Sequence, residues 1–320
     1  MSNARASSLD LSFIQDIISL NKCPEYNGYL TKAVREQGHA LKPKTKIVYL
    51  PLIDSPPANP STMVVCMLRA KKLTENTGQQ YVILTLDQQL YRVALHIQWH
   101  DPPSFKNTFI RLGGMHILMS YVGSIGTLME NTGMSELQSG PFGGVNKMLT
   151  GKKFPENVCA LRLLTEELLQ PVLSSDTICT FNDLLNVLSD LASNSRTAHL
   201  WIDCLILPVM TMMKYIRAER ESDWPLHILA VKEMVPLFFA AGHHNYARYC
   251  SYYISSMDAM PGHIQKQFLK GEHTVHHTAG ISNGIWSDMA IETTYMRYGH
   301  GRSGIVGLTL NPESLKTWSY

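Results

Sequence analysis

Residues 81–87 read Tyr-Val-Ile-Leu-Thr-Leu-Asp, a largely apolar run that stops at an acidic residue. Apolar side chains on consecutive positions predict a strand covered on both faces, as in the centre of a parallel or mixed sheet. A second short run at residues 109–112 leads into Gly113 and Gly114 and predicts another strand. A helix is expected from Met115 onward. These elements predict an α/β core in the first half of the chain.

The composition is that of a folded protein with a sizeable core. The chain has 320 residues, of which 45% are hydrophobic and 17% charged, and its formal net charge is +2. Such a chain can bury enough apolar surface to offset the entropy of ordering, which excludes general disorder. The charge is also too near neutral for a strongly basic nucleic-acid-binding surface.

The pattern changes along the chain and predicts a helix-rich protein. Short turns separate helix-patterned segments after about residue 145, and residues 180–183 and Asp223 have the form of helix starts. A β-favouring run at residues 46–50 is expected to belong to the core. We expect four parts: a helical segment at 1–44, the first part of the α/β core at 45–144, an all-α insertion at 145–270, and a C-terminal return to the core, cut short, at 271–320.

The cysteines and the N-terminus indicate an intracellular protein. None of the six cysteines forms a C-x-x-C pair, and several lie in apolar stretches, as buried thiols do. The first 20 residues lack the unbroken apolar segment of a secretion signal. The two longest apolar segments, residues 112–129 and 200–213, contain polar or helix-breaking residues, so we expect no membrane span.

Asp87 is the first candidate for chemistry. A carboxylate at the end of a buried strand must be capped, paired or bound to a metal, because an isolated buried charge is costly. One interpretation makes Asp87 the cap of a helix that starts near Gln88. The other makes it a metal ligand.

A second acidic group lies near the C-terminus. Asp288 and Glu292 are four residues apart and would share one face of a helix, where like charges repel. A divalent cation or Arg297 would relieve that repulsion. The alternative is a solvated acidic face near a helix N-terminus, which the helix dipole favours.

Two further patterns carry weaker signals. Residues 299–304 match G-x-G-x-x-G without the flanking strand and helix of a dinucleotide site, so we interpret them as a turn in which Arg297, His300 and Arg302 could contact nucleic-acid phosphates. His273 and His277 have the spacing of zinc ligands on a helix, but we expect surface or hydrogen-bonding histidines there.

Several stretches together resemble a family of uncharacterised animal proteins encoded by transposable elements. They are residues 86–91, 111–116, 123–126, 149–152 and 288–296. The order of elements is similar to that of transposases with a ribonuclease H-like mixed sheet, in which a helical block precedes the last acidic residue. The resemblance implies Asp87 and Glu292 as catalytic residues, with Asp288 and His116 as further metal ligands, and Mg²⁺ or Mn²⁺ as cofactor.

The resemblance also implies a function and leaves two alternatives open. The function is cleavage or strand transfer of DNA, with DNA as partner, a nuclear location and a homo-oligomer as one form of assembly. The resemblance implies a triad of acidic residues, of which Asp87 would be the first and Glu292 the last. No acidic residue fits the middle position, where His116 stands. An inactive copy of the transposable-element protein is therefore one alternative. The other is a non-catalytic helical interaction or assembly protein whose surface would hold Trp224 and a group of tyrosines, namely Tyr246, Tyr249, Tyr252 and Tyr253. Core packing would explain the same aromatic residues.

Overall fold

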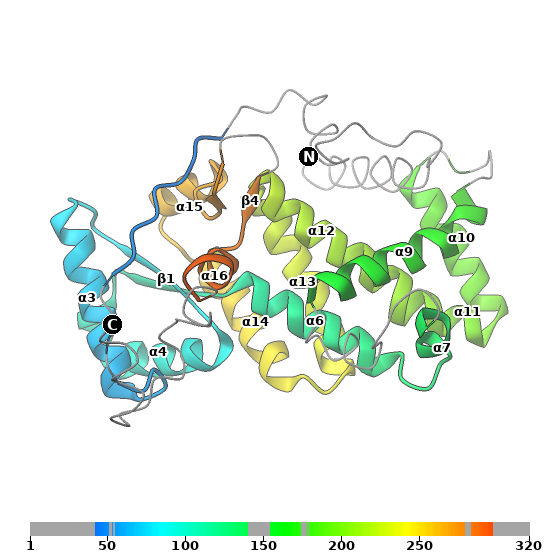
Figure 1. The fold of residues 1–320 in the computed structure, drawn as a ribbon, viewed down its shortest axis with the longest axis horizontal. Helices are drawn as coiled ribbons and strands as arrows, with labels where there is room; N and C mark the ends of the chain where they lie inside the picture. The colour runs from blue at the N-terminus through cyan, green and yellow to red at the C-terminus, as the bar shows by residue number, and fades with distance from the viewer. Residues whose placement is uncertain are drawn as a thin grey trace, which may run out of the picture.

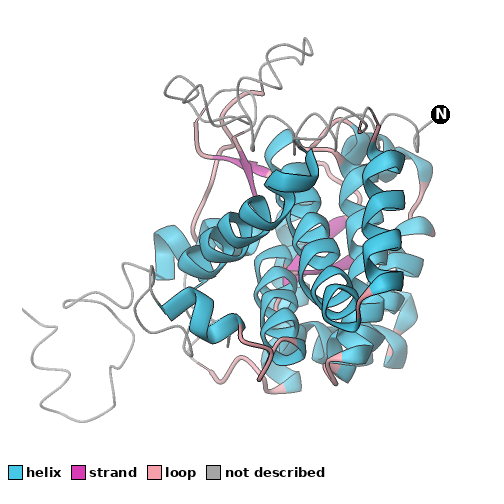
Figure 2. Cartoon of the chain, turned by 90° about the vertical axis from the view of Figure 1, so that its right-hand side faces the viewer, coloured by secondary structure: helices cyan, strands magenta, loops and turns pink. Residues whose placement is uncertain are grey.

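The computed structural model describes residues 42–50, 53, 55–139, 154–173, 178, 180–278 and 283–296. Within them the protein is helix-rich, as predicted, and its strands are few and short. Figure 1 shows α3, α4 and β1 at one end of an elongated molecule and α9, α10 and α11 at the other. The view in Figure 2, turned by 90°, shows the strands flanked by helices.

One end of the molecule is a parallel β-α-β unit. Its elements are α3 (Pro60–Asn76), β1 (Val82–Leu86), α4 (Gln88–His100), α5 (Pro102–Phe105), β2 (Thr108–Leu112) and α6 (Gly114–Leu128). Strands β1 and β2 pair in parallel, from Val82 opposite Thr108 to Leu86 opposite Leu112. Both predicted strands are therefore confirmed. Because the strands are parallel, their carboxyl ends meet at the same edge.

The helical block follows. It comprises α7 (Met134–Ser139), α9 (Phe154–Leu173), α10 (Phe181–Asn194), α11 (Arg196–Trp201), η1 (Ile202–Ile206), α12 (Leu207–Glu221), α13 (Trp224–Ala240), α14 (His244–Asp258) and α15 (Gly262–Leu269). Two of its starts are as predicted. Thr180 and Asp183 form a reciprocal capping box at α10, and the Asp223 side chain accepts a hydrogen bond from Leu226 N at the start of α13.

The last described segment returns to the β-α-β unit. A short antiparallel pair, β3 (Val275–His276) and β4 (Gly284–Ile285), precedes α16 (Ser287–Ile291) and the π-helical turn η2 (Glu292–Met296). Helix α16 packs against α6 and β1. Residues nearly 200 positions apart in the chain are thereby brought to one edge of the sheet.

Helix α6 joins the two ends of the molecule. Most of its residues are buried, because apolar side chains cover all of its faces. It contacts α13, α12 and α9, and the larger hydrophobic core of the described residues extends from α3 to α15, while a smaller one lies between α9, α10 and η1. Each aliphatic or aromatic side chain buried there contributes roughly 1.5–3 kcal/mol. The helical block therefore does not pack as a separate body.

The β-favouring run at residues 46–50 forms no strand. These residues have no regular secondary structure and pair with no strand in the described part of the chain, and Val48 is 67% exposed. Their β-favouring composition lacks the packing surface that stabilises a strand. The Tyr49 hydroxyl donates a hydrogen bond to Thr294 in η2 instead.

The described residues hold two two-stranded sheets and no larger mixed sheet. Residues 1–41 of the predicted N-terminal helical segment lie outside them.

The aromatic group proposed as a partner surface belongs mostly to the core. Tyr249, Tyr253 and Trp224 are at most 6% exposed, and Tyr246 is half-buried. Tyr252 remains partly exposed, where its hydroxyl accepts a hydrogen bond from Trp99 Nε1. Core packing therefore explains most of these residues.

One helical run, Arg196–Glu221, is long and apolar enough among the described residues to cross a membrane. It comprises α11, η1 and α12, and it packs against α13, α6 and α9. Its Arg217 and Glu219 side chains are buried against the rest of the protein. Of its most apolar window, 39% is buried inside the protein.

Candidate functional site

The candidate site lies where the two parallel strands end. Asp87 directly follows β1, and Gly113 directly follows β2. The Gly113 N–H donates a hydrogen bond to Leu86 O at 2.7 Å, which continues the strand pairing up to the start of α6. Ligands of open α/β sheets bind at this kind of edge, because loops and helix N-termini converge there.

Asp288 caps helix α6 from a distant part of the chain. Its Oδ1 accepts a hydrogen bond from Met115 N and its Oδ2 one from His116 N, each at 3.2 Å. Gly113, at the N-cap position, has no side chain to do this. A carboxylate is favoured there because a helix N-terminus carries unpaired N–H groups and partial positive charge.

The same carboxylate holds the imidazole of His116. His116 Nδ1 lies 2.9 Å from Asp288 Oδ2. Since an ionised carboxylate only accepts, Nδ1 carries the proton of this hydrogen bond. The imidazole is 30% exposed and the carboxylate 9%, so the pair lies at the border between core and solvent.

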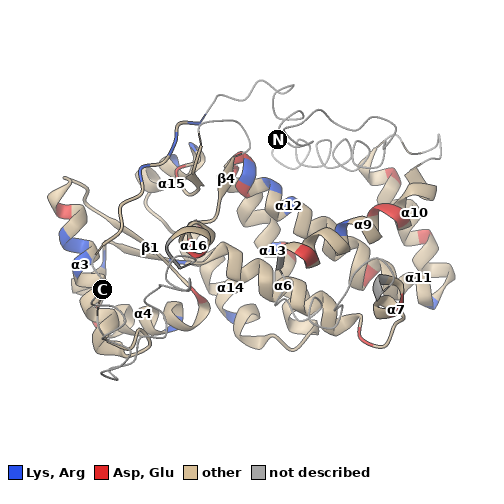
Figure 3. Cartoon of the chain, viewed as in Figure 1, with Lys and Arg blue, Asp and Glu red and all other residues tan. Residues whose placement is uncertain are grey.

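Three carboxylates raise the pKa of His116. The hydrogen bond from Asp288 raises the pKa of His116 above its ordinary value, and the negative charges of Asp288, Asp87 and Glu292 raise it further, while burial opposes them. Of the acids implied by the resemblance, Asp288 contacts the imidazole, and Asp87 and Glu292 act on it through their charge alone. The three acids come from three segments: the end of β1, the start of α16 and the start of η2. Figure 3 marks acidic positions on α16 in red.

Two glycines allow this close packing. A Cβ atom at Gly113 would overlap Oδ2 of Asp288, and one at Gly114 would overlap the indole of Trp286. Trp286 in turn stacks on Tyr215 of α12, with ring centroids 5.5 Å apart. Residues without a side chain are thus required here for α16 to reach the N-terminus of α6.

Asp87 is the N-cap of α4. Its Oδ1 accepts a hydrogen bond from Leu90 N at 2.8 Å, which confirms the capping interpretation. A cap uses one carboxylate oxygen, and the Asp87 side chain is only half-buried. Capping therefore does not by itself prevent the carboxylate from binding a ligand.

The structure describes Glu292 but not the residues predicted to contact phosphates. Glu292 is exposed at the first position of η2, four residues after Asp288 on a continuous helical segment. Arg297, His300 and Arg302 lie outside the described residues. Their predicted contact with phosphates remains a prediction.

The donor set fits a magnesium or manganese ion only in part. Among the described residues, no three His, Cys, Asp or Glu side chains form a group that could hold a metal by themselves. Asp288 is engaged by three donors from α6 and His116. Asp87 and Glu292 are two carboxylates at the same edge, and Mg²⁺ is often held by one or two carboxylates together with water and substrate phosphates.

A buried polar network lies behind the site and was not predicted from the sequence. Arg111 of β2 donates a hydrogen bond to His273 O at 3.0 Å, and its guanidinium lies over the rings of Trp224 and Phe268. His273 is buried and hydrogen-bonded to Phe268 O. The hydrogen-bonding interpretation of this histidine is therefore confirmed, although it does not lie on the surface.

The fold and the site define a helix-rich protein built around one β-α-β unit with an acidic, histidine-containing edge. The chain matches one protein family, described as "Domain of unknown function (DUF8702)", over residues 25–182 and 176–320, and it belongs to that family. No curated protein and no solved structure matches the chain.

Proposed function

We propose that the chain is a transposable-element-encoded protein that cleaves or transfers DNA strands at the edge formed by Asp87, His116, Asp288 and Glu292. The observation that carries the proposal is the contact of Asp288 with His116 at the carboxyl ends of β1 and β2, where Asp87 directly follows β1 and the charges of Asp87 and Glu292 act on the same imidazole. An acid after the first strand and acids on a late helix are also the layout of the ribonuclease H-like class. The proposed partner is DNA.

The charge of the site favours a divalent cation. Asp288 is paired with His116, which leaves the charges of Asp87 and Glu292 without a cation in direct contact among the described residues. A phosphodiester would be repelled from such an edge unless a cation came with it. Asp87 and Glu292 would hold Mg²⁺ or Mn²⁺, which would neutralise the phosphate and activate the attacking oxygen.

His116 would move the proton. Asp288 fixes the ring through Nδ1, so Nε2 is the nitrogen left to exchange a proton with a ligand. The raised pKa keeps the imidazole protonated at a higher pH than usual, as a general acid requires. In this role Nε2 donates its proton to the oxygen that leaves the phosphorus. Asp288 is then a positioning residue, since it acts through His116 and the N-terminus of α6.

Nicking of supercoiled plasmid DNA tests the proposal. The full chain is expected to nick DNA with Mn²⁺ or Mg²⁺ and to lose this activity with a chelator. Glu292→Gln is expected to lower the rate by about 100-fold or more, because a neutral amide is a poor ligand for a hard cation. Since Glu292 is exposed, the variant should fold like the parent. Equal nicking by parent and variant would contradict the proposal, as would absence of nicking by the parent.

A further inference from the structure

Trp99, near the C-terminus of α4, presents one face of its indole to solvent. Its side chain is 51% exposed. The Nε1–H lies in the plane of the ring and donates a hydrogen bond to the Tyr252 hydroxyl of α14 at 3.1 Å, so Tyr252 contacts the edge of the indole. His96 packs against one face, with ring centroids 5.6 Å apart and an angle of 30° between the planes. The exposed part of the indole is therefore largely the other face.

The two contacts hold this indole in place. His96 belongs to the same helix as Trp99, and Tyr252 belongs to α14, so the ring is fixed from both sides of the contact between the two helices. Tryptophan is highly buried on average, which makes a half-exposed one informative. A ring that is already ordered loses little conformational entropy when it binds a flat ligand. The open face of Trp99 is therefore a preformed stacking surface.

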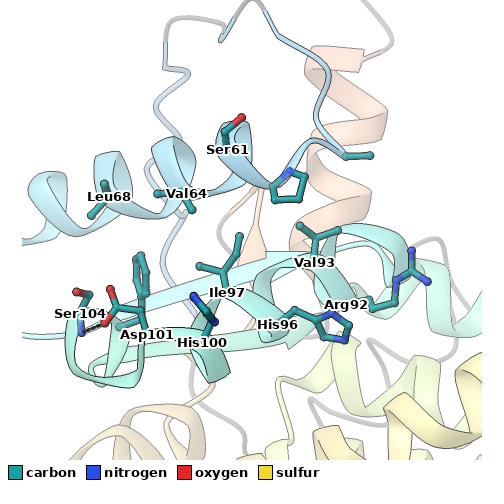
Figure 4. A pocket seen from close by; sticks show the side chains of 13 residues that line it. Ser61, Val64, Leu68, Arg92, Val93, His96, Ile97, His100, Asp101 and Ser104 are labelled. Atoms are coloured by element: carbon teal, nitrogen blue, oxygen red, sulfur yellow. Dashed lines mark hydrogen bonds between the residues drawn. The ribbon is translucent and has the colours of Figure 1, made fainter.

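Two arginines lie near the stacking surface. Arg92, labelled in Figure 4, is seven residues before Trp99, so it lies on the same face of α4 at a distance of about 10 Å along the helix. Arg248 is four residues before Tyr252 on α14, one helical turn away. Its guanidinium lies over the ring of Tyr249, 4.8 Å from the centroid. Each of the two helices therefore supplies one cation.

The two helices carry little negative charge. Helix α4 contains no acidic residue, and α14 contains only Asp258, which lies 3.5 Å from Lys232 Nζ. Asp101 follows α4, and its carboxylate accepts a hydrogen bond from Ser104 N at the start of α5 (Figure 4). The surface is thus weakly positive and can lie beside phosphates. The open indole face, rather than the charge, determines which ligand fits.

We propose that Trp99 stacks on an unpaired base of single-stranded DNA, with Arg92 and Arg248 beside phosphates of the same strand. Single strands bind in this way to other proteins, because every base has a π face and flanking cations attract the backbone. Bases inside a duplex are stacked on each other, so their faces are not free. An aliphatic ligand would gain nothing from a flat ring held at a fixed angle.

The choice of DNA as the strand rests on the proposed function. Asp87 caps the N-terminus of the helix that carries Trp99, twelve residues later, so the two lie about 18 Å apart along α4. A strand bound at Trp99 would thus extend along α4 toward the acidic edge. The stacking itself needs neither a cation nor cleavage, so it can be tested separately from the proposed chemistry.

Fluorescence anisotropy on the full chain tests the proposal. The probe is a labelled single-stranded DNA of about 12 nucleotides, within the usual range of single-strand sites, in buffer with EDTA so that no cleavage occurs. Unlabelled competitors are the same strand, its blunt duplex, an RNA of the same sequence, and poly-glutamate. We expect binding that weakens with salt, and competition by the single strand at least about 10-fold better than by the duplex or poly-glutamate.

Variants of the two helices locate the binding. Trp99→Leu keeps the apolar bulk but removes the aromatic face, and it should raise the Kd about 10-fold or more, whereas Trp99→Phe should stay within about threefold. Arg92→Ala should weaken binding and lower the salt dependence by about one phosphate contact. Phe239→Leu changes an exposed aromatic residue of α13 and is the matched control, with a Kd within about twofold of the parent. Melting temperatures verify that the variants fold.

Four outcomes would overturn the proposal. They are absence of single-strand binding by the parent, equal binding by the parent and Trp99→Leu, equal competition by poly-glutamate and the single strand, and clearly tighter binding of the RNA, which would identify RNA as the ligand. Because EDTA removes the cation, each of them is distinguishable from a failure of the proposed cleavage, which plasmid nicking measures.

Discussion

His116 Nδ1 and Asp288 Oδ2 lie 2.9 Å apart although the residues are 172 positions apart in the chain. The contact joins the helix that follows β2 to the segment that returns after the whole helical block. It therefore fixes both the N-terminus of α6 and the place of α16.

Asp288→Ala should destabilise the protein. The substitution removes the acceptor of two α6 N–H groups and the partner of the His116 imidazole. We expect the free energy of unfolding to fall by about 2–3 kcal/mol, because polar groups at a largely buried helix terminus lose their partners. Urea denaturation measures this. Glu292→Ala, at an exposed position, is the control and should change stability by less than about 0.5 kcal/mol. Equal stability of Asp288→Ala and the parent would contradict the capping role.

Alanine at Gly114 should be poorly tolerated. Its Cβ would overlap the indole of Trp286, which is itself buried against Tyr215. We expect a loss of about 1–3 kcal/mol in the free energy of unfolding, as for other overpacked sites. Gly262→Ala is the matched control, since nothing lies within 4 Å of its added Cβ and the residue begins α15. That variant should be neutral or more stable by up to about 1 kcal/mol. Equal effects of the two substitutions would show that α16 does not pack as described.

Stability should fall as the solution becomes acidic. Burial and the nearby charge of Arg111 lower the pKa of His273 well below its ordinary value, and burial lowers that of His227. The unfolded chain, whose histidines titrate near pH 6.5, then binds more protons than the folded one. Each group contributes stability that is present above about pH 6.5 and is lost as the pH falls toward its folded value. Each of these histidines can lower the free energy of unfolding by at most about 1.4 kcal/mol per pH unit.

Urea denaturation between pH 7.5 and 5, about the range of histidine titration, measures this effect. His116 acts in the opposite sense: its pKa is raised, so its contribution is present below about pH 6.5 and is lost as the pH rises through its folded value. His116→Gln should therefore steepen the loss of stability on acidification. A free energy of unfolding that stays flat from pH 7 to 5 would contradict the assignment of His273 and His227 as buried neutral groups.

The sequence predicts the local features of this protein better than its long-range contacts. Strand β1, the cap at Asp87 and the capping box at Thr180 follow from neighbouring residues. The pairing of His116 with Asp288 depends on how the helical block folds back, which no local pattern encodes. One signal existed: Gly113 and Gly114 follow a buried strand and precede His116, which indicates a close approach by another segment.

Two further differences have the same physical origin. Residues 46–50 have strand propensity, but they pair with no strand among the described residues and stay exposed. Arg111 is buried within β2 because the rings of Trp224 and Phe268 and the carbonyl of His273 lie around its guanidinium. All three partners are more than 100 positions away in the sequence, so the burial of Arg111 could not be anticipated from its neighbours.

A comparison of two aspartate caps tests the proposed catalytic edge most directly. Asp87 caps α4 and Asp101 caps α5, and asparagine caps a helix as well as aspartate does. Asp87→Asn and Asp101→Asn should both melt within about 2 °C of the parent. Mn²⁺-dependent plasmid nicking, measured on the same samples, should fall at least about 100-fold for Asp87→Asn and stay at the parent level for Asp101→Asn. Nicking by Asp87→Asn at the parent rate would contradict the proposed function.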